Sequence, residues 1–126
     1  MIFYHVTRMG NEESILREGL RPDRMSDRWQ RPRRKKAVFL WGSLKSARIA
    51  ERSEAFNGQL DGAIFRVRIP RSWVFPDETF VTDDPLNEGF DEPRDRFACF
   101  RRIPPERLEI LRYGRWRRRE DLKGHP

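Results

Sequence analysis

The sequence predicts an α+β fold, with two short helices near the N-terminus followed mainly by strands. Most apolar residues gather in short runs that are rich in β-branched and aromatic residues, as is typical of strands. Two stretches instead carry a capping residue followed by apolar residues at helical spacing. With 126 residues, the chain is long enough for one domain with one hydrophobic core.

The chain is expected to begin with a strand at residues 2–6, because four of these five residues favour extended backbone. A short helix should follow, since Asn11 can cap it and the glutamates at residues 12–13 place negative charge in its first turn. Gly19 suits a helix C-cap with positive φ. His5 lies near the end of the strand, and this lone histidine raises the main functional question.

The middle of the chain continues with a loop, a strand, a helix and a second strand. Residues 21–36 are basic and contain prolines, and they show no apolar period, so we expect a long loop. The wholly apolar residues 37–41 predict a central strand. Ser43 then suits the N-cap of a helix that ends at the Asn-Gly pair of residues 57–58. Residues 63–69 alternate and predict a half-buried strand whose arginines face away from the core.

The second half of the chain predicts mainly short strands. A long acidic loop is expected at residues 83–94. We assign residues 1–112 to the domain and residues 113–126 to a basic tail, in which a further hairpin arm at residues 114–116 is the alternative. The expected strands lie at residues 73–75, 97–100 and 107–112.

The net charge of +7 is distributed unevenly. Two basic clusters flank an acidic stretch at residues 77–95. This polarity favours nucleic acid or an acidic protein surface as a partner, and a solvated surface partly neutralised by the acidic stretch is the alternative. Trp29 could stack on bases, or it could instead pin its loop to the core. The clusters comprise Arg28, Trp29, Arg31, Arg33, Arg34, Lys35 and Lys36 in the first, and Arg115, Arg117, Arg118 and Arg119 in the second.

Composition also excludes several classes of protein. No apolar run approaches the roughly 20 residues that a membrane helix needs, so we expect no membrane partner. The single cysteine, Cys99, excludes an internal disulfide and a cysteine-based zinc site, and we expect it in the core. No metal site is predicted. The chain is typical of a cytoplasmic protein.

Three short motifs together resemble a known superfamily. The first is Tyr-His-Val-Thr at residues 4–7, followed by Ser-Ile-Leu-Arg-Glu-Gly-Leu at residues 14–20. The second is Val-Phe-Leu at residues 38–40, leading to Lys-Ser-Ala on a helix, and the third is Arg-Phe-Ala-Cys-Phe at residues 96–100, running into Ile-Pro-Pro-Glu-Arg-Leu. The chain resembles the ADP-ribosyltransferase superfamily, in the branch with the His-Tyr-Glu polymerases, the DarT-like DNA-modifying toxins and the RNA 2′-phosphotransferases.

The resemblance implies a split, strongly twisted and mostly antiparallel sheet with a cleft between its halves, and NAD as the cofactor. By position, His5 would contact a ribose hydroxyl, and the main chain of Val6 and Thr7 would lie at the nicotinamide amide. Phe39 falls where the family stacks a tyrosine on nicotinamide, and Trp41 lies close by. The implied cofactor-binding residues are His5, Val6, Thr7, Phe39, Trp41 and Ser43.

The sequence departs from the family at the start of the late strand. The family places a glutamate there to stabilise positive charge on the sugar, whereas this chain has Arg96, preceded by Asp95. An arginine repels such a cation but can hold a phosphate in a bidentate contact. The candidates for the reacting ribose are therefore Asp95, Arg96 and Glu92.

Three functional hypotheses follow. The first is NAD-dependent transfer of ADP-ribose to nucleic acid or to a protein target. The second is a catalytically inactive module of the same fold, such as a phage- or toxin-derived protein, that binds nucleic acid or inhibits a host protein through its basic surface. In the third, the resemblance is accidental and the chain is a basic α+β interaction domain.

Overall fold

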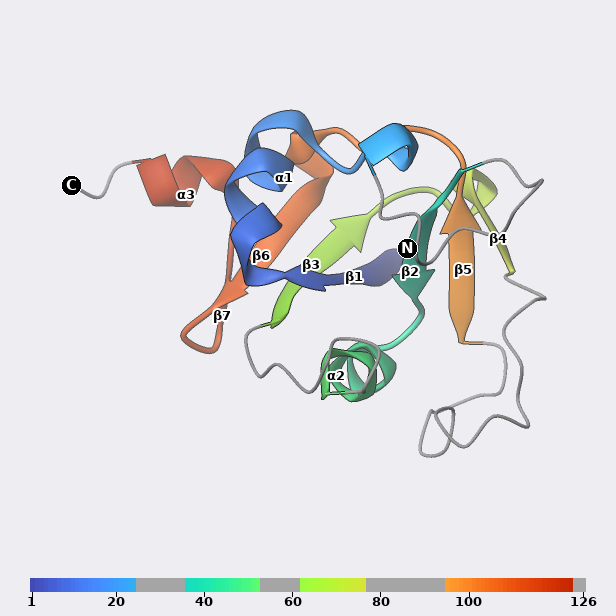
Figure 1. The fold of residues 1–126 in the computed structure, drawn as a ribbon, viewed down its shortest axis with the longest axis horizontal. Coiled ribbons are helices and arrows are strands. Elements are labelled where there is room, and N and C mark those ends of the chain that lie inside the picture. Colours follow the sequence, from blue (N-terminus) through green and yellow to red (C-terminus); the bar gives the residue numbers. More distant parts are fainter. Residues whose placement is uncertain (25–35, 53–61, 77–94, 124–126) are drawn as a thin grey trace.

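The structure, a computed structural model, describes residues 1–24, 36–52, 62–76 and 95–123 (Figure 1). The expected α+β class is confirmed, because this part of the chain forms a seven-stranded antiparallel sheet with few helices. The strands are β1 (Ile2–Arg8), β2 (Val38–Trp41), β3 (Gly62–Arg68), β4 (Val74–Pro76), β5 (Arg96–Cys99), β6 (Leu108–Arg112) and β7 (Arg115–Arg117). The α-helices are α1 (Glu12–Glu18), α2 (Leu44–Arg52) and α3 (Arg119–Lys123).

The strands follow the spatial order β4-β5-β2-β1-β3-β6-β7. Strands β1 and β3 pair along their whole length, from Ile2 opposite Arg68 to Arg8 opposite Gly62. Strands β1 and β2 pair at a single position, Tyr4 opposite Trp41. In Figure 1, β2 and β5 run steeply across the direction of β1. The sheet therefore has a three-strand part (β4, β5, β2) and a four-strand part (β1, β3, β6, β7) that meet at one ladder pair.

Helices α1 and α2 lie on opposite sides of the sheet (Figure 1). On the α1 side, Ile15 joins a buried cluster with Phe3 and Phe65. On the α2 side, Ala47 and Ala50 form a smaller cluster that includes residues of β1 and β3. The expected central position of β2 is confirmed, because it lies between β5 and β1.

Strand β3 shows how the alternating pattern produces this layering. Its residues Phe65 and Val67 are fully buried, whereas Arg68, on the other face, is exposed, as the alternation predicts. Ile64 shares the face of the arginines and yet is 2% exposed. Ile64 is buried because α2 covers that end of the face with Ala47 and Ala50.

The first helix forms as expected, but its N-terminus is organised differently. The Asn11 side chain makes no capping hydrogen bond, and its amide nitrogen donates to the Thr7 hydroxyl at 3.1 Å. Gly19 ends the helix with φ 82°, and its N–H donates to the Ile15 carbonyl oxygen at 2.8 Å. A Cβ at Gly19 would collide with the backbone of Ile103, so the close approach of two segments also requires glycine there.

The C-terminal residues continue the sheet. Strand β7 pairs with β6 from Ile110 opposite Arg117 to Arg112 opposite Arg115. The turn between them has positive φ at Tyr113 (50°) and Gly114 (77°), as in hairpin turns that match the strand twist. The structure thus has the hairpin arm that we considered as an alternative for the tail, and α3, which the sequence did not predict, follows it. The expected helix end at residues 57–58 and the acidic loop at residues 83–94 lie outside the described residues.

Candidate functional site

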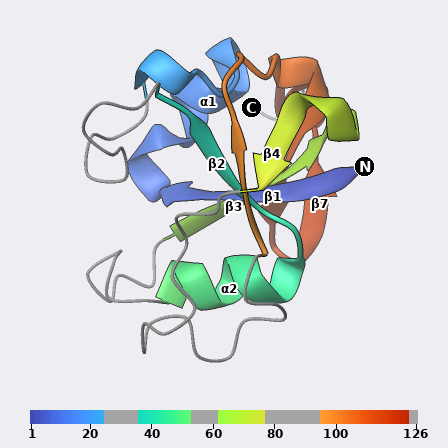
Figure 2. The same ribbon diagram turned by 90° about the vertical axis from the view of Figure 1, so that its right-hand side faces the viewer.

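The three segments that carry the motifs meet at one place in the sheet. Strands β5, β2 and β1 are neighbours, with Arg96 opposite Trp41 and Trp41 opposite Tyr4 (Figure 2). Nδ1 of His5 lies 2.9 Å from the carbonyl oxygen of Phe39. The guanidinium carbon of Arg96 lies 4.3 Å from the centroid of the Phe39 ring. Residues 5, 39 and 96 are therefore far apart in sequence but close together on three neighbouring strands. We call the place where they meet the β1–β2–β5 junction.

His5 is buried, and its hydrogen bond fixes the tautomer of the neutral ring. A carbonyl oxygen can only accept, so Nδ1 carries the proton and Nε2 has a free lone pair. No described residue is hydrogen-bonded to Nε2. Desolvation by burial lowers the pKa of His5 to about 4, although the bond to the Phe39 carbonyl favours the charged form. At neutral pH, His5 is therefore an uncharged ring that offers one acceptor.

The junction residues divide between the two faces of the sheet. Side chains alternate along a strand, so His5, which lies opposite Phe65, shares the face of the α1-side core. Arg96, Trp41 and Tyr4 are cross-strand partners and share the other face. His5 reaches β2 through a backbone carbonyl of Phe39 rather than through a side chain. The structure thus brings His5 close to the β2 aromatics but not onto their face.

Asp95 holds the start of β5 to the N-terminus of α2. Its Oδ2 accepts hydrogen bonds from the hydroxyls of Ser43, at 2.8 Å, and Ser46. Its backbone oxygen accepts from the N–H of Gly42 at 3.0 Å. Asp95 is 8% exposed, so the fold already uses this carboxylate. Gly42 permits the approach, because a Cβ there would collide with the Asp95 carboxylate and press on the Phe97 ring.

Ser43 is the N-cap that the sequence predicted. The backbone N–H of Ser46 donates to its hydroxyl oxygen at 3.1 Å, which satisfies one of the donors left open in the first turn of α2. The same hydroxyl donates to Asp95, so Ser43 joins the helix, the loop before it and the start of β5. This capping contact explains why a serine stands here.

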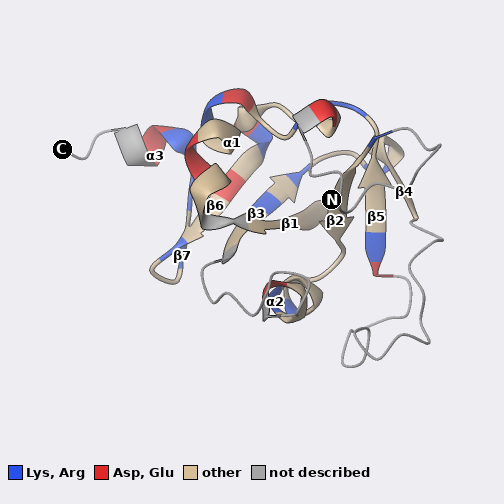
Figure 3. Ribbon diagram, in the orientation of Figure 1, with Lys and Arg blue, Asp and Glu red and all other residues tan. Residues whose placement is uncertain are grey.

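Arg96 stacks on two aromatic rings of β2. Its guanidinium carbon lies 4.3 Å from the centroid of Phe39 and 5.6 Å from that of Trp41. Such contacts are favourable because the ring faces carry partial negative charge. In Figure 3, the start of β5 carries a basic position directly after an acidic one, namely Arg96 after Asp95. The arginine therefore covers the Phe39 ring on which a nicotinamide was expected to stack.

The remaining predicted residues fall into two groups. Val6 and Thr7 are buried and lie within the β1–β3 ladder, and the Thr7 hydroxyl accepts from Asn11. In the second basic cluster, Arg115 and Arg118 are exposed, and Arg117 and Arg119 are half-buried. Lys36 is exposed. Outside the described residues lie Glu92, Arg28, Trp29, Arg31, Arg33, Arg34 and Lys35.

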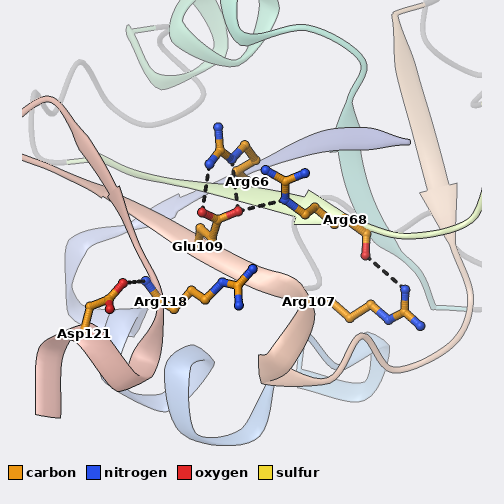
Figure 4. Close-up of polar contacts among 6 residues, drawn as sticks. All are labelled: Arg66, Arg68, Arg107, Glu109, Arg118 and Asp121. Carbon is orange, nitrogen blue, oxygen red and sulfur yellow. Dashed lines mark hydrogen bonds and ion pairs between the residues drawn. The ribbon is translucent and has the colours of Figure 1, made fainter.

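Sequence reasoning missed a polar cluster around Glu109 (Figure 4). The cluster shares the face of Tyr4, because Tyr4 lies opposite Arg66 and Arg66 lies opposite Glu109. Arg66 donates to both carboxylate oxygens of Glu109, at 3.2 and 2.8 Å, and Arg68 donates to one of them at 2.9 Å. The hydrogen bond from Arg66 is the main reason why the pKa of Glu109 lies below its ordinary value. Arg66 also lies 4.7 Å from the centroid of the Trp116 ring. The alternating sequence of β3 could have indicated this cluster, because an arginine that faces away from the core on an inner strand needs a partner.

Comparisons of the chain with protein-family models, with curated proteins and with solved structures found no match. None of the helices in the described ranges is long and apolar enough to cross a membrane. Within the same ranges, no group of three or more His, Cys, Asp or Glu side chains is arranged to hold a metal ion.

The junction fits NAD in part. His5 fits, because a neutral acceptor suits a ribose hydroxyl. Phe39 fits the role of stacking on nicotinamide only if the Arg96 guanidinium moves off the Phe39 ring. Asp95 does not fit the role of the ribose carboxylate, because Oδ2 is held by two serine hydroxyls.

Proposed function

We propose that this chain is an ADP-ribosyltransferase-like protein that binds NAD at the β1–β2–β5 junction and transfers ADP-ribose to nucleic acid or to a protein target. The observation that carries the proposal is the convergence of His5, Phe39 and Arg96, one residue from each resembling motif. The single ladder pair between β1 and β2 supports a sheet of the split kind that the resemblance implies. Both features are properties of the described residues and do not depend on the resemblance.

His5 is the residue whose role is best supported. The Phe39 carbonyl holds its Nδ1–H and so orients Nε2 as an acceptor for a ribose hydroxyl. Its low pKa keeps it neutral throughout the physiological range, so that it does not add positive charge beside a sugar that becomes positive. NAD, when bound, supplies the ADP-ribosyl group and nicotinamide as the leaving group.

Arg96 and the acidic candidates have different roles in this proposal. When Arg96 leaves the Phe39 ring, its planar guanidinium can bind phosphate oxygens in a bidentate contact, and the ring is freed for stacking. Asp95 remains at the N-terminus of α2, where it holds the start of β5. The carboxylate that stabilises the sugar then has to come from elsewhere, and Glu92 is the remaining candidate.

Two variants of His5 test the proposal. Asparagine places its amide nitrogen close to the position of Nδ1, so His5→Asn keeps a donor for the Phe39 carbonyl but removes the Nε2 acceptor. We expect the wild-type protein to show a thermal shift with NAD and to transfer label from labelled NAD to nucleic acid or to lysate proteins. His5→Ala and His5→Asn should both abolish transfer, and the melting temperature of His5→Asn without NAD should stay closer to that of the wild type. Absence of both transfer and thermal shift in the wild type would contradict the proposal.

The contacts of Asp95 and Arg96 at the start of β5 favour a second candidate function. Asp95 is held by serines and Arg96 covers Phe39, so a catalytically inactive module of the same fold is the alternative. Such a module would bind nucleic acid, or inhibit a host protein, through its basic surface. It predicts nucleic-acid binding that weakens steeply with salt and is lost when Arg33, Arg34, Lys35 and Lys36 are neutralised, with no transfer of label from NAD.

A further inference from the structure

A second group of aromatic and arginine side chains gathers at the edge of the sheet, where β4 pairs with β5. Figure 2 shows β4 and β5 on the near side of the molecule. The group comes from the 3₁₀ turn before β4, from β4 itself and from the segment between β5 and β6. We call it the β4–β5 surface, and it comprises Arg71, Trp73, Phe75, Phe100, Arg101 and Arg107.

The aromatic residues of this surface are unusually exposed. Phe75 is 55% exposed and Phe100 is 38% exposed, although both are large and apolar. Their rings lie 5.8 Å apart, centroid to centroid, with a tilt of 46° between their planes. The two rings therefore form one solvent-facing aromatic platform. Burying them in the core would have been the ordinary outcome for phenylalanine.

The arginines of this surface are held by aromatic and backbone contacts on the α1-side face of the sheet, across the edge strand β4 from the platform. The guanidinium carbons of Arg101 and Arg107 lie 3.9 and 5.0 Å from the centroid of the Trp73 ring. Arg107 also donates to the backbone oxygen of Arg68 at 3.4 Å (Figure 4). Arg71 lies 5.1 Å from the centroid of Phe97. Contacts of this kind limit the rotamers of long side chains, so less entropy is lost when a ligand binds.

The charge of the surface specifies the kind of ligand. The β4–β5 surface as defined contains three arginines and no acidic residue. A second copy of the chain would oppose like charges across a two-fold interface, which disfavours a dimer through this surface. Exposed rings can stack only on bases whose faces are free, which duplex nucleic acid does not offer. Guanidinium groups on the other side of the edge strand suit the phosphates of a single strand that passes over this edge.

We propose that the β4–β5 surface binds single-stranded nucleic acid, with Phe75 and Phe100 stacking on bases and Arg71, Arg101 and Arg107 contacting phosphates. This site shares no residue with the β1–β2–β5 junction or with the two basic clusters identified in the sequence, although Phe75 lies in the same row of the sheet as Phe39, with Ala98 between them. It requires no NAD, so the proposal stands or falls independently of the proposed transferase activity.

Fluorescence anisotropy without NAD tests the proposal. The probes are labelled oligo(dT) and oligo(U) of about 12 nucleotides, within the range of single-strand sites, and a duplex hairpin of equal charge. We expect both single strands to bind more tightly than the duplex. Phe75→Ala and Phe100→Ala should each weaken binding about tenfold, because loss of one stacking contact has an effect of this order. Since both side chains are exposed, the melting temperature should change little.

The arginine variants are expected to change the salt dependence of binding. The combined change Arg71→Gln, Arg101→Gln and Arg107→Gln should reduce the slope of log affinity against log salt by about 2, since each phosphate contact on a single strand contributes roughly 0.7. The matched control is Arg17→Gln with Arg48→Gln, which neutralises exposed arginines of α1 and α2 that belong to none of the candidate surfaces. This control should leave single-strand affinity within about twofold, as expected of surface residues outside the site.

Several outcomes would overturn the proposal. Equal or tighter binding of the duplex would rule out stacking as the basis of recognition. Unchanged affinity in both phenylalanine variants, or loss confined to the Arg17 and Arg48 control, would move the site elsewhere. A concentration-dependent dimer that Phe75→Ala dissociates, or capture of polyglutamate with no single-strand binding, would identify a protein ligand instead. A thermal shift with NAD in the absence of oligonucleotide binding would leave the transferase proposal intact.

Discussion

The two parts of the sheet are held together by different means. In the four-strand part, β1 and β3 share an uninterrupted ladder, and Phe65 and Val67 of β3 are fully buried beneath it. The three-strand part joins β1 through one ladder pair, and a hydrogen bond from His5 to the Phe39 carbonyl oxygen spans the strands beside that pair. Asp95 adds a second polar connection, from β5 to α2.

This difference shows where polar side chains take the place of backbone pairing. The four-strand part depends mainly on apolar burial and backbone pairing, to which the ion pairs of Glu109 add a pH-dependent contribution. The junction depends on a neutral histidine and a buried carboxylate, and these polar groups are the same ones that the sequence marked as functional candidates. A junction built on side chains rather than on a ladder is also the easier one to change by ligand binding.

The largest expected effect tests the apolar core of the four-strand part. Phe65→Ala should lower the free energy of unfolding by about 3–5 kcal/mol, because it removes a fully buried ring and leaves a cavity. Phe75→Ala in the three-strand part is the matched control and should cost less than about 1 kcal/mol, since Phe75 is largely exposed. Urea unfolding of both variants measures the difference. Similar costs would show that the comparison of the two parts is wrong.

The next effect concerns His5 and pH. The pKa of His5 is about 4 in the folded protein and close to 6.5 when unfolded, so between these values the unfolded chain binds more protons. Stability from this group is fully present above pH 6.5 and is lost as the pH falls toward 4, by about 3 kcal/mol in all. His5→Asn should remove this dependence. An unchanged slope in that variant would place the responsible group elsewhere.

Asp95 tests the second polar connection at the junction. Asp95→Asn should lower the free energy of unfolding by about 2 kcal/mol, because charge-assisted hydrogen bonds to two serine hydroxyls are weakened in a buried site. Ser43→Ala should cost about 1 kcal/mol through loss of the helix cap. The double variant should cost less than the sum of the two, since the residues share one hydrogen bond. Strict additivity in urea unfolding would argue against this network.

The smallest effect is expected at the ion pairs of the four-strand part. Glu109→Gln should cost about 1 kcal/mol at low salt and less at high salt, because the Arg68 side chain is 51% exposed and solvent screens its charge. The pKa of Glu109 is lowered in the folded protein, so its contribution is present above the ordinary glutamate range and is lost as the pH falls below it. In acid titrations of stability, the curves of the wild type and Glu109→Gln should therefore be separated at neutral pH and should converge as the pH falls below the ordinary glutamate range.

Local patterns were enough to predict much of the fold. Residues 37–41 predicted a central strand because no other position suits a wholly apolar run, and Gly19 predicted a helix end because few other residues accept its φ. Asn11 was assigned correctly to the start of the helix, but the hydrogen bond of its side chain was not predicted. The side chain of a capping residue can also bond to other nearby groups, and here the Asn11 amide donates to the Thr7 hydroxyl.

The candidate site was harder to predict, because its contacts join residues that are distant in sequence. Asp95 finds its partners Ser43 and Ser46 more than forty positions earlier, and no local pattern contains that information. The division of His5 and Arg96 between two faces follows from the register of Tyr4 with Trp41, which depends on the assembled sheet.

The strand order also constrains how this chain can be made. Strand β1 is synthesised before the other described strands, yet its long ladder partner does not begin until Gly62, and the partner of Ile2 is Arg68. Pairings between such distant segments close large loops and slow the folding of a domain. Until then, the nascent chain carries an unpaired apolar strand, which is a site for association with other chains. Translation products that stop before β3 is complete should therefore aggregate rather than fold.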